Sequence, residues 1–241
     1  MTVEKSSERR EKFNGFMSSV DEHTFGSNEK MIDFMKKYGN GLIRDDVFSA
    51  MKKIDRAEFI QSQSPYELEP VPIGYGQTCS APYVVAIFNE VLNLKPDERV
   101  LEIGSGCGYH ASTVATQMGR GEVQSFEIIE ELSRLAERNI KRVKSKVDMA
   151  DVHVHFGDAS EGFKDEDDFD AIYMASSAPA GYDVEILLKQ LKNKGRLVIP
   201  LKEHWGGGRV FLFEASKESP EVECIADMAF VPLIGKKGFE V

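Results

Sequence analysis

Between residues 84 and 200 the sequence alternates between two hydrophobic patterns, and this alternation limits the possible folds more than any other feature. Short apolar runs predict strands, and longer stretches with apolar residues three or four positions apart predict helices. Strands are expected at 99–103, 122–126, 152–156, 171–175 and 196–200, and helices at 84–92, 110–118, 130–146 and 184–191. Because strands that alternate with helices form βαβ units, we expect an α/β fold with a doubly wound, mostly parallel sheet.

The N-terminal part of the chain has a weaker pattern. Residues 1–28 mix charged residues, Ser and Gly without a sustained period, so we expect a flexible extension ahead of one folded domain at 29–241. Helical spacing returns at 31–38 and again at 47–54, which predicts two N-terminal helices before the main fold. A chain of 241 residues is long enough for one α/β domain with a sizeable core.

Two other regions depart from the alternation. Residues 65–83 contain four Pro, two Gly and three Tyr without any period, and we expect a long irregular segment there. Such a segment inside a compact domain is usually functional. Near the C-terminus, the strand-like runs 209–214 and 224–232 have no long helix between them. They predict an antiparallel hairpin at one end of the sheet.

A glycine-rich loop at 104–108 connects the strand at 99–103 to the next helix. Glycine lets a ligand approach the backbone, and the helix N-terminus offers free N–H groups, although a purely structural turn has the same composition. The dinucleotide fingerprint would need glycine at 109, where this chain has tyrosine. A pyrophosphate gains nothing from Glu102 ahead of the loop, whereas an ammonium group does. The loop therefore favours a cationic amino-acid conjugate.

Two further acids follow the next two strands. Glu127 closes the second strand, where an acid typically accepts hydrogen bonds from ribose hydroxyls. Asp158 follows the third strand and is placed to accept the exocyclic amine of an adenine; a solvated acid and a turn aspartate are the alternatives. The carboxyl ends of parallel strands meet at one edge, so these acids and Glu102 describe one crevice for ammonium, ribose and adenine. The matching ligand is S-adenosyl-L-methionine.

Composition excludes several other classes of function. The net charge is −10, so the surface repels nucleic acid. The three cysteines contain no C-x-x-C pair, so we expect no metal site and a reducing compartment. The N-terminus lacks the apolar core of a signal peptide and no 18 apolar residues run together, so we expect a cytoplasmic protein without membrane partners.

Six segments, in order along the chain, resemble the protein-L-isoaspartate (D-aspartate) O-methyltransferase family over about residues 30–235. They are 72–83 (PIGYGQTCSAPY), 102–108 (EIGSGCG), 157–158 (GD), 175–179 (ASSAP), 194–200 (KGRLVIP) and 230–233 (FVPL). The first segment is the most specific, because it belongs to this family and not to methyltransferases in general. Cys79 stands where the family usually has an aliphatic residue, Ala159 where glycine is usual, and Ser176 and Ser177 where alanine or glycine is usual.

The resemblance implies a seven-stranded sheet of the class I S-adenosylmethionine-dependent methyltransferase type. It implies methyl transfer to the free α-carboxylate of L-isoaspartyl residues in damaged proteins by a repair enzyme, with D-aspartyl residues as a second class of substrate. We expect a monomer. Ser80 matches the family's active-site serine, and Ile73, Ser80, Val231 and Leu233 are expected to bind substrate. The expected cofactor-binding residues are Gln77, Thr78, Cys79, Ser80, Tyr83, Glu102, Gly104, Ser105, Gly106, Gly108, Glu127, Asp158 and Ala159.

The chemistry of a carboxylate nucleophile agrees with this reading. A carboxyl group with a pKa near 4 is already ionised at pH 7, so the reaction needs no general base. The site has to align carboxylate, methyl and sulfur and to exclude water. Two alternatives remain open: a related methyltransferase that acts on a dedicated peptide or another carboxylate, and an inactive adapter that only binds the cofactor.

Overall fold

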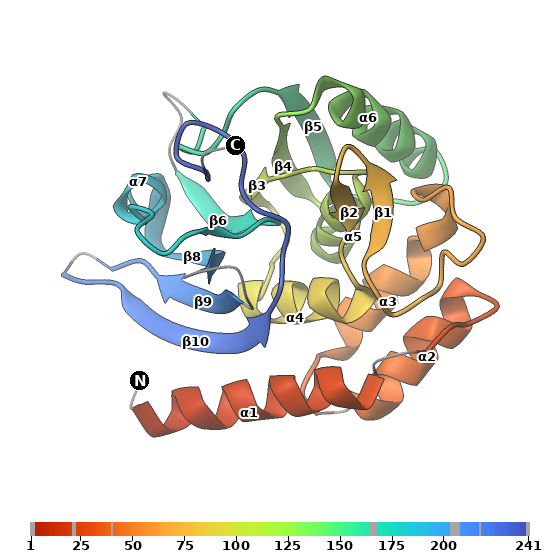
Figure 1. The fold of residues 1–241 in the computed structure, drawn as a ribbon, viewed down its shortest axis with the longest axis horizontal. Coiled ribbons are helices and arrows are strands. Elements are labelled where there is room, and N and C mark those ends of the chain that lie inside the picture. Colours follow the sequence, from red (N-terminus) through yellow and green to blue (C-terminus); the bar gives the residue numbers. More distant parts are fainter. Residues whose placement is uncertain are drawn as a thin grey trace.

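A large twisted sheet organises the molecule, with strand order β10-β9-β8-β6-β3-β4-β5 and with β7 beside β8 (Figure 1). The computed structural model describes residues 3–20, 23–39, 41–163, 168–202, 208–216 and 218–239. The strands of this sheet are β3 (Glu98–Ile103), β4 (Gly121–Glu127), β5 (Asp151–Phe156), β6 (Phe169–Met174), β7 (Ala178–Pro179), β8 (Leu191–Lys202), β9 (Gly208–Glu214) and β10 (Glu221–Met228). Strands β3 to β8 pair in parallel, whereas β9 pairs antiparallel with both β8 and β10. The expected doubly wound sheet with its C-terminal antiparallel hairpin is confirmed.

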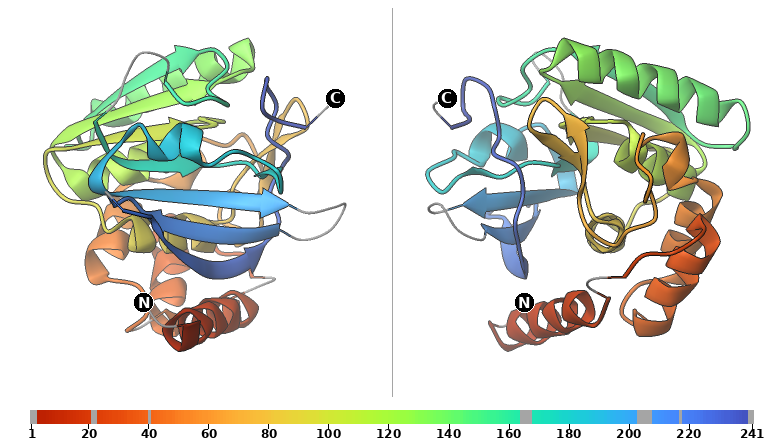
Figure 2. Two further views of the ribbon diagram at one scale, coloured as in Figure 1. Left: turned by 90° about the vertical axis from the view of Figure 1, so that its left-hand side faces the viewer. Right: turned by 45° about the vertical axis from the view of Figure 1, so that its right-hand side comes forward.

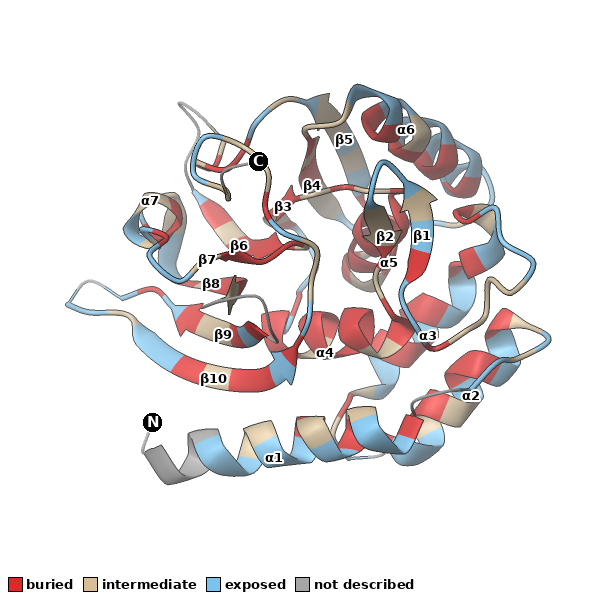
Figure 3. Ribbon diagram, viewed as in Figure 1, coloured by how far each residue is buried: buried red, intermediate tan, exposed pale blue. Residues whose placement is uncertain are grey.

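Helices cover both faces of the sheet. They are α1 (Val3–Val20), α2 (Asn28–Tyr38), α3 (Asp45–Lys53), α4 (Pro82–Leu92), α5 (Tyr109–Met118), α6 (Glu130–Lys144), α7 (Glu185–Leu188) and the short 3-10 helix η1 (Arg56–Glu58). Alternate residues of a strand point to opposite faces. Val100 and Tyr173 accordingly join the core that includes α2 to α6, and Leu101 and Ile172 join the second core with α7. Figure 3 shows these central strands and the inner sides of the helices as buried.

A buried ion pair fastens the amino-terminal edge of the sheet. The guanidinium of Arg196 in β8 donates to both carboxylate oxygens of Glu98 in β3, at 2.7 and 3.0 Å. It also donates to the backbone carbonyls of Leu92 and Asp170. Both side chains are largely buried and have lost their hydration. The bidentate geometry and the additional hydrogen bonds to the two carbonyls compensate for this loss.

The boundaries of two elements differ from the sequence-based expectation. The helix expected at 184–191 is only Glu185–Leu188, because Leu191 already pairs with Phe169 as the first residue of β8. The last strand ends at Met228, not at 232. The segment after it leaves the sheet edge and pairs with the 175–179 run, through the bridge between Ser177 and Pro232.

Part of the expected irregular segment at 65–83 is a small β-hairpin. Strands β1 (Val71–Gly74) and β2 (Gln77–Cys79) pair antiparallel and are joined by Tyr75 and Gly76. Both joining residues have positive φ, 55° and 69°, as a type I′ turn requires. The hairpin was not predicted because the usual sequence signal for this turn is Asn-Gly. Here the turn is Tyr-Gly, and the strands beside it are only three and four residues long.

The expectation of a flexible extension at 1–28 is wrong for α1. This helix packs along β10, as both views in Figure 2 show, and buries Phe13, Phe16 and Val20. Arg10 in α1 donates from two nitrogens to the carboxylate of Asp227 in β10, at 2.6 and 2.9 Å. Three buried residues among many charged ones give too weak a period to predict. Among the described helices, none is long and apolar enough to cross a bilayer.

Replacing Phe16 with alanine should lower the free energy of unfolding by about 3–5 kcal/mol, the usual cost of emptying a buried phenylalanine site. The ring is 3% exposed and lies against Gly39 at the end of α2. Urea denaturation measures the loss. The control Ser18→Ala, at an exposed position of the same helix, should change stability by less than about 0.5 kcal/mol. Equal stabilities for the two variants would show that α1 does not unfold with the core.

Candidate functional site

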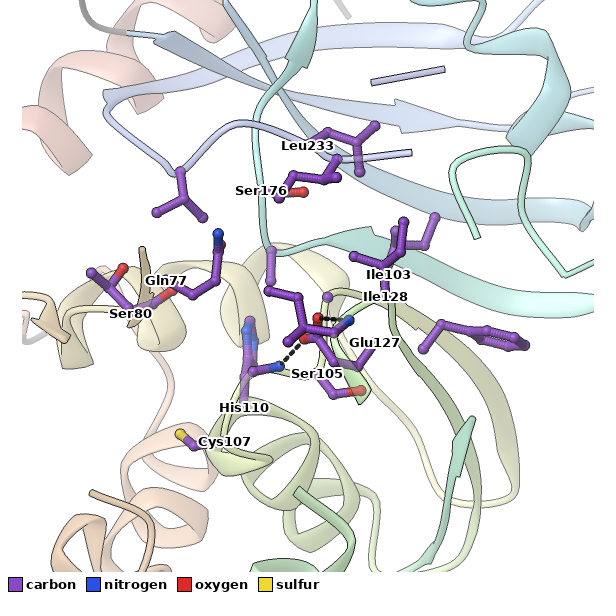
Figure 4. A pocket seen from close by; sticks show the side chains of 18 of the residues that line it. Gln77, Ser80, Ile103, Ser105, Cys107, His110, Glu127, Ile128, Ser176 and Leu233 are labelled. Carbon is purple, nitrogen blue, oxygen red and sulfur yellow. Dashed lines mark hydrogen bonds between the residues drawn. The ribbon is translucent and has the colours of Figure 1, made fainter. Parts of the chain in front are cut away.

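A pocket lies at the carboxyl ends of β3, β4, β5 and β6 (Figure 4). The β1–β2 hairpin and the segment after β10 complete its wall. The lining residues are 77–80, 85, 103–107, 109–110, 126–129, 157, 159–160, 175–176 and 231–234. This is the crevice that the sequence placed at one edge of a parallel sheet.

The glycine loop forms the floor of the pocket and is held by the end of β4. The backbone N–H groups of Gly104 and Ser105 both donate to the carbonyl of Phe126, at 2.8 and 2.9 Å. Gly106 has φ of 53°, and a Cβ there would lie 3.2 Å from Ile73 of the hairpin. Glycine therefore allows both the left-handed backbone and the close approach of β1.

Glu127 presents a carboxylate to this floor. Its Oε2 accepts from the N–H of Gly106 at 2.8 Å, and its Oε1 accepts from the N–H of Ile129 at 3.0 Å. Burial raises the pKa of this carboxyl, against the hydrogen bonds that lower it. A carboxylate has about four acceptor sites, so acceptor capacity remains at the pocket wall. A vicinal diol matches that capacity.

Glu102 does not line the pocket. It is fully buried beneath the loop, where it accepts from the hydroxyl of Tyr173 at 2.7 Å and from Ser125. Burial raises its pKa to about 7. Ser125 also contacts Ser105, whose side chain does line the pocket. Glu102 therefore supports the loop through Ser125, and the expected direct contact with a ligand is not what the structure shows.

Asp158 is also outside the lining. Its carboxylate accepts from the backbone N–H groups of Ser160, at 2.8 Å, and of Lys236, at 2.7 Å. A Cβ at Gly235 would lie 2.4 Å from this carboxylate, so glycine is needed for the C-terminal segment to come so close. In this structure Asp158 anchors that segment, and the next residue, Ala159, takes the place at the pocket.

Three more of the expected residues lie outside the lining. Ile73 lies 3.2 Å from where a Cβ on Gly106 would be, and Tyr83 packs half-buried against the main core. A Cβ on Gly108 would come within 3.0 Å of Ile140 in α6, so this glycine serves helix packing. The expected residues that do meet in the pocket are Gln77, Thr78, Cys79, Ser80, Gly104, Ser105, Gly106, Glu127, Ala159, Val231 and Leu233.

The segment after β10 is tied down opposite the hairpin. The N–H of Ser177 donates to the carbonyl of Val231, and the N–H of Leu233 donates to the carbonyl of Ser177, both at 2.8 Å. These bonds place Val231 and Leu233 at the pocket, with Ser80 on the hairpin side of it (Figure 4).

Several pocket residues were not predicted from the sequence. They are Val85, Ile103, Cys107, Tyr109, His110, Phe126, Ile128, Ile129, Gly157, Ser160, Ala175, Ser176, Pro232 and Ile234. Many of them directly follow or end a strand, and this position in the sequence could have been used to predict them. His110 is not a base, because burial lowers its pKa to about 3 while its ring contacts Asn89.

The pocket thus combines a carboxylate with spare acceptors, a glycine floor, a hydroxyl at Ser80 and an apolar cover. Among the described residues that line the pocket beside Ser80, the Cys79 thiol is the one side chain that could remove a proton near neutral pH. No group of three or more His, Cys, Asp or Glu in the described ranges is arranged to hold a metal ion.

Comparisons with known proteins give one answer. Residues 26–238 match the family described as protein-L-isoaspartate(D-aspartate) O-methyltransferase. The protein-L-isoaspartate O-methyltransferase of Methanothrix thermoacetophila is 36% identical over 217 residues, which cover 88% of this chain and 97% of the relative. The protein-L-isoaspartate O-methyltransferase 1 of Archaeoglobus fulgidus is 41% identical over 203 residues, covering 82% and 89%.

Solved structures agree with the sequence comparisons. A Plasmodium falciparum chain described as a candidate protein-L-isoaspartate O-methyltransferase, in complex with S-adenosyl-L-homocysteine, superposes with a TM-score of 0.74 at 28% identity. The match covers 86% of this chain and 98% of that one. Family match, relatives and fold together show that the chain belongs to the protein-L-isoaspartate (D-aspartate) O-methyltransferase family.

Proposed function

We propose that this protein transfers a methyl group from S-adenosyl-L-methionine to the free α-carboxylate of L-isoaspartyl residues in damaged proteins and peptides. One observation carries the proposal: Glu127 and Ser80 line the same pocket, together with residues 104–107 of the glycine loop. The family's relatives carry the name of this activity over most of the chain's length.

The residues present fit the cofactor. Glu127 retains acceptor capacity that suits two ribose hydroxyls, and each of its oxygens is already oriented by a backbone N–H. Gly104 and Gly106 have φ of 98° and 53° and leave the floor free of side chains. Phe126 and Leu233 add apolar surface at the wall. S-adenosyl-L-methionine, when bound, supplies an electrophilic methyl group on a sulfonium.

Ser80 and the start of α4 are the groups we assign to the substrate carboxylate. Ser80 lines the pocket two residues before Pro82, the first residue of α4. A helix N-terminus favours a negative charge, and a hydroxyl donates one neutral hydrogen bond. This combination orients the carboxylate without quenching its nucleophilicity, and the Val231–Leu233 cover excludes water from it.

Some finer points are also proposals. We propose that D-aspartyl residues are substrates as well, that residues 29–241 form the catalytic domain with α1 as an accessory helix, and that the protein is a cytoplasmic monomer. The odd number of cysteines without a C-x-x-C pattern supports a reducing compartment.

The function is tested with labelled S-adenosyl-L-methionine and two peptides that differ only in an isoaspartyl or an aspartyl linkage. We expect label in the isoaspartyl peptide alone, because its carboxylate sits on a backbone-like branch offset by one methylene. Equal labelling of both peptides, or labelling of neither, contradicts the repair function. Cofactor binding without any transfer would instead favour an adapter.

Glu127→Ala should weaken binding of S-adenosyl-L-methionine about 5- to 150-fold, or about 1–3 kcal/mol, because buried hydroxyls lose their acceptors. Calorimetric titration measures the affinity. The matched control is Glu122→Ala at the start of the same strand, where the carboxylate pairs with Arg99 away from the pocket. We expect unchanged affinity for the control, and unchanged affinity for both variants would show that Glu127 does not hold the cofactor.

Ser80→Ala should reduce methyl transfer about 10- to 100-fold, or about 1.4–2.7 kcal/mol, through the loss of one positioning hydrogen bond. Cofactor affinity should remain within a few-fold, because the loop and Glu127 are untouched. Between about pH 6 and 8 neither protein should show a rate that climbs tenfold per unit, because the nucleophile is already ionised. Such a climb in the unaltered protein would demand a general base and exclude this mechanism. Exposed Ser62→Ala is the control and should keep full activity.

A further inference from the structure

Tyr75, at the tip of the β1–β2 hairpin, has a backbone conformation that does not suit tyrosine. Its φ of 55° lies in the left-handed region, where a Cβ crowds the backbone and where glycine and asparagine are preferred. A type I′ turn needs this conformation at its first central position, and asparagine there forms the same turn at a lower steric cost. The turn itself therefore does not account for the tyrosine.

Packing within the protein does not account for it either. Tyr75 is 59% exposed. Its carbonyl accepts from the side-chain amide of Gln77 at 3.4 Å, whereas its ring and its phenol have no stacking or hydrogen-bonding partner among the described residues. A Cβ on Gly74 or on Gly76 would meet nothing within 4 Å, so open space surrounds the tip. An exposed aromatic ring on a strained turn is typical of a contact surface.

The tip of the hairpin adjoins the pocket. Gln77, whose side chain donates to the carbonyl of Tyr75, lines the pocket next to Ser80 (Figure 4). Tyr75 precedes Ser80 by five positions, and five residues of extended chain span at most about 17 Å. The substrate residue proposed above lies inside a polypeptide, so its chain has to leave the pocket on both sides. A residue a few positions from the isoaspartyl residue therefore reaches the tip of the hairpin.

We propose that Tyr75 is a specificity-determining residue whose ring contacts an apolar side chain of the substrate peptide, outside the pocket that receives the isoaspartyl carboxylate. This assignment rests on the proposed function and adds a preference for apolar neighbours of the damaged residue. A tyrosine ring offers a large apolar face and has few rotatable bonds, so the contact costs little conformational entropy. Because the contact lies away from the reacting atoms, it stabilises bound substrate and transition state equally, and it lowers KM without changing kcat.

The test compares two seven-residue peptides with a central isoaspartyl residue. The residues two and three positions away on each side are leucine in one peptide and alanine in the other. For the unaltered protein we expect a KM about 3- to 10-fold lower for the leucine peptide, which is the effect of one aromatic contact. Tyr75→Asn should raise KM for the leucine peptide by the same factor, leave kcat unchanged and remove the difference between the two peptides.

Folding stability separates a substrate contact from a structural role. Tyr75→Asn should unfold at the same or a higher urea concentration, because asparagine tolerates a positive φ. Tyr75→Phe keeps the ring and should keep the low KM. The matched control is Tyr38→Asn, which removes another exposed tyrosine at the end of α2, outside the pocket lining, and should leave both KM values unchanged. Equal KM values for the two peptides in the unaltered protein, an unchanged KM in Tyr75→Asn, or a loss of stability in that variant overturns the proposal.

Peptide binding is also measured without methyl transfer, by the fluorescence anisotropy of a labelled leucine peptide in the presence of S-adenosyl-L-homocysteine. Tyr75→Asn should weaken this binding by the same factor as it raises KM. If the unaltered protein binds the peptide without methylating it, the proposed function is wrong, while the binding comparison still decides the role of Tyr75. A protein that neither binds nor methylates the peptide contradicts both.

Discussion

The carbonyl of Phe126 accepts two backbone hydrogen bonds, from Gly104 and Ser105, and the rest of the site depends on this junction. Ile103 and Phe126 are register partners in adjacent parallel strands, so the loop after β3 turns directly over the end of β4. The next N–H of the loop that is held by β4 is that of Gly106, which donates to the side-chain carboxylate of Glu127. A ligand on this floor meets a backbone that is already oriented, so little ordering cost remains to oppose binding.

The cover of the pocket comes from two segments that are distant in sequence. The hairpin reaches the floor through Ile73, which touches Gly106, and the C-terminal segment reaches it through its bonds with Ser177. Asp158 fixes the far end of that segment by accepting from Lys236. The floor is therefore part of the sheet, whereas the cover is held by a small number of specific backbone bonds.

The sequence predicted the sheet and the edge that carries the site, because period and strand order determine both. It could not predict which acids line the pocket. Glu102 is the register partner of both Ser125 and Tyr173, so the three side chains share one face of the sheet and satisfy one another beneath it. The position of an acid at a strand end predicts the edge of the sheet where it lies. Whether its carboxylate already accepts hydrogen bonds from neighbouring side chains depends on the adjacent strands, which the sequence does not identify. The docking of α1 was missed for a related reason, because Phe13 and Phe16 become a buried apolar face only when the helix packs on the folded domain.

The Arg56–Cys79 pair also affects the chemistry expected at Ser80. A free guanidinium beside the pocket would bind the substrate carboxylate strongly and lower its nucleophilicity. Here Arg56 is fully buried, and two of its N–H groups donate to the thiol and to the backbone carbonyl of Cys79, so the guanidinium is held away from the pocket. In the proposed reaction the substrate carboxylate would meet the neutral hydroxyl of Ser80 instead of a cation. His110 does not replace that cation, because burial lowers its pKa to about 3 and keeps the ring neutral. Because Ser80 offers only a neutral donor, the sulfonium of bound S-adenosyl-L-methionine would supply the positive charge that attracts the substrate carboxylate.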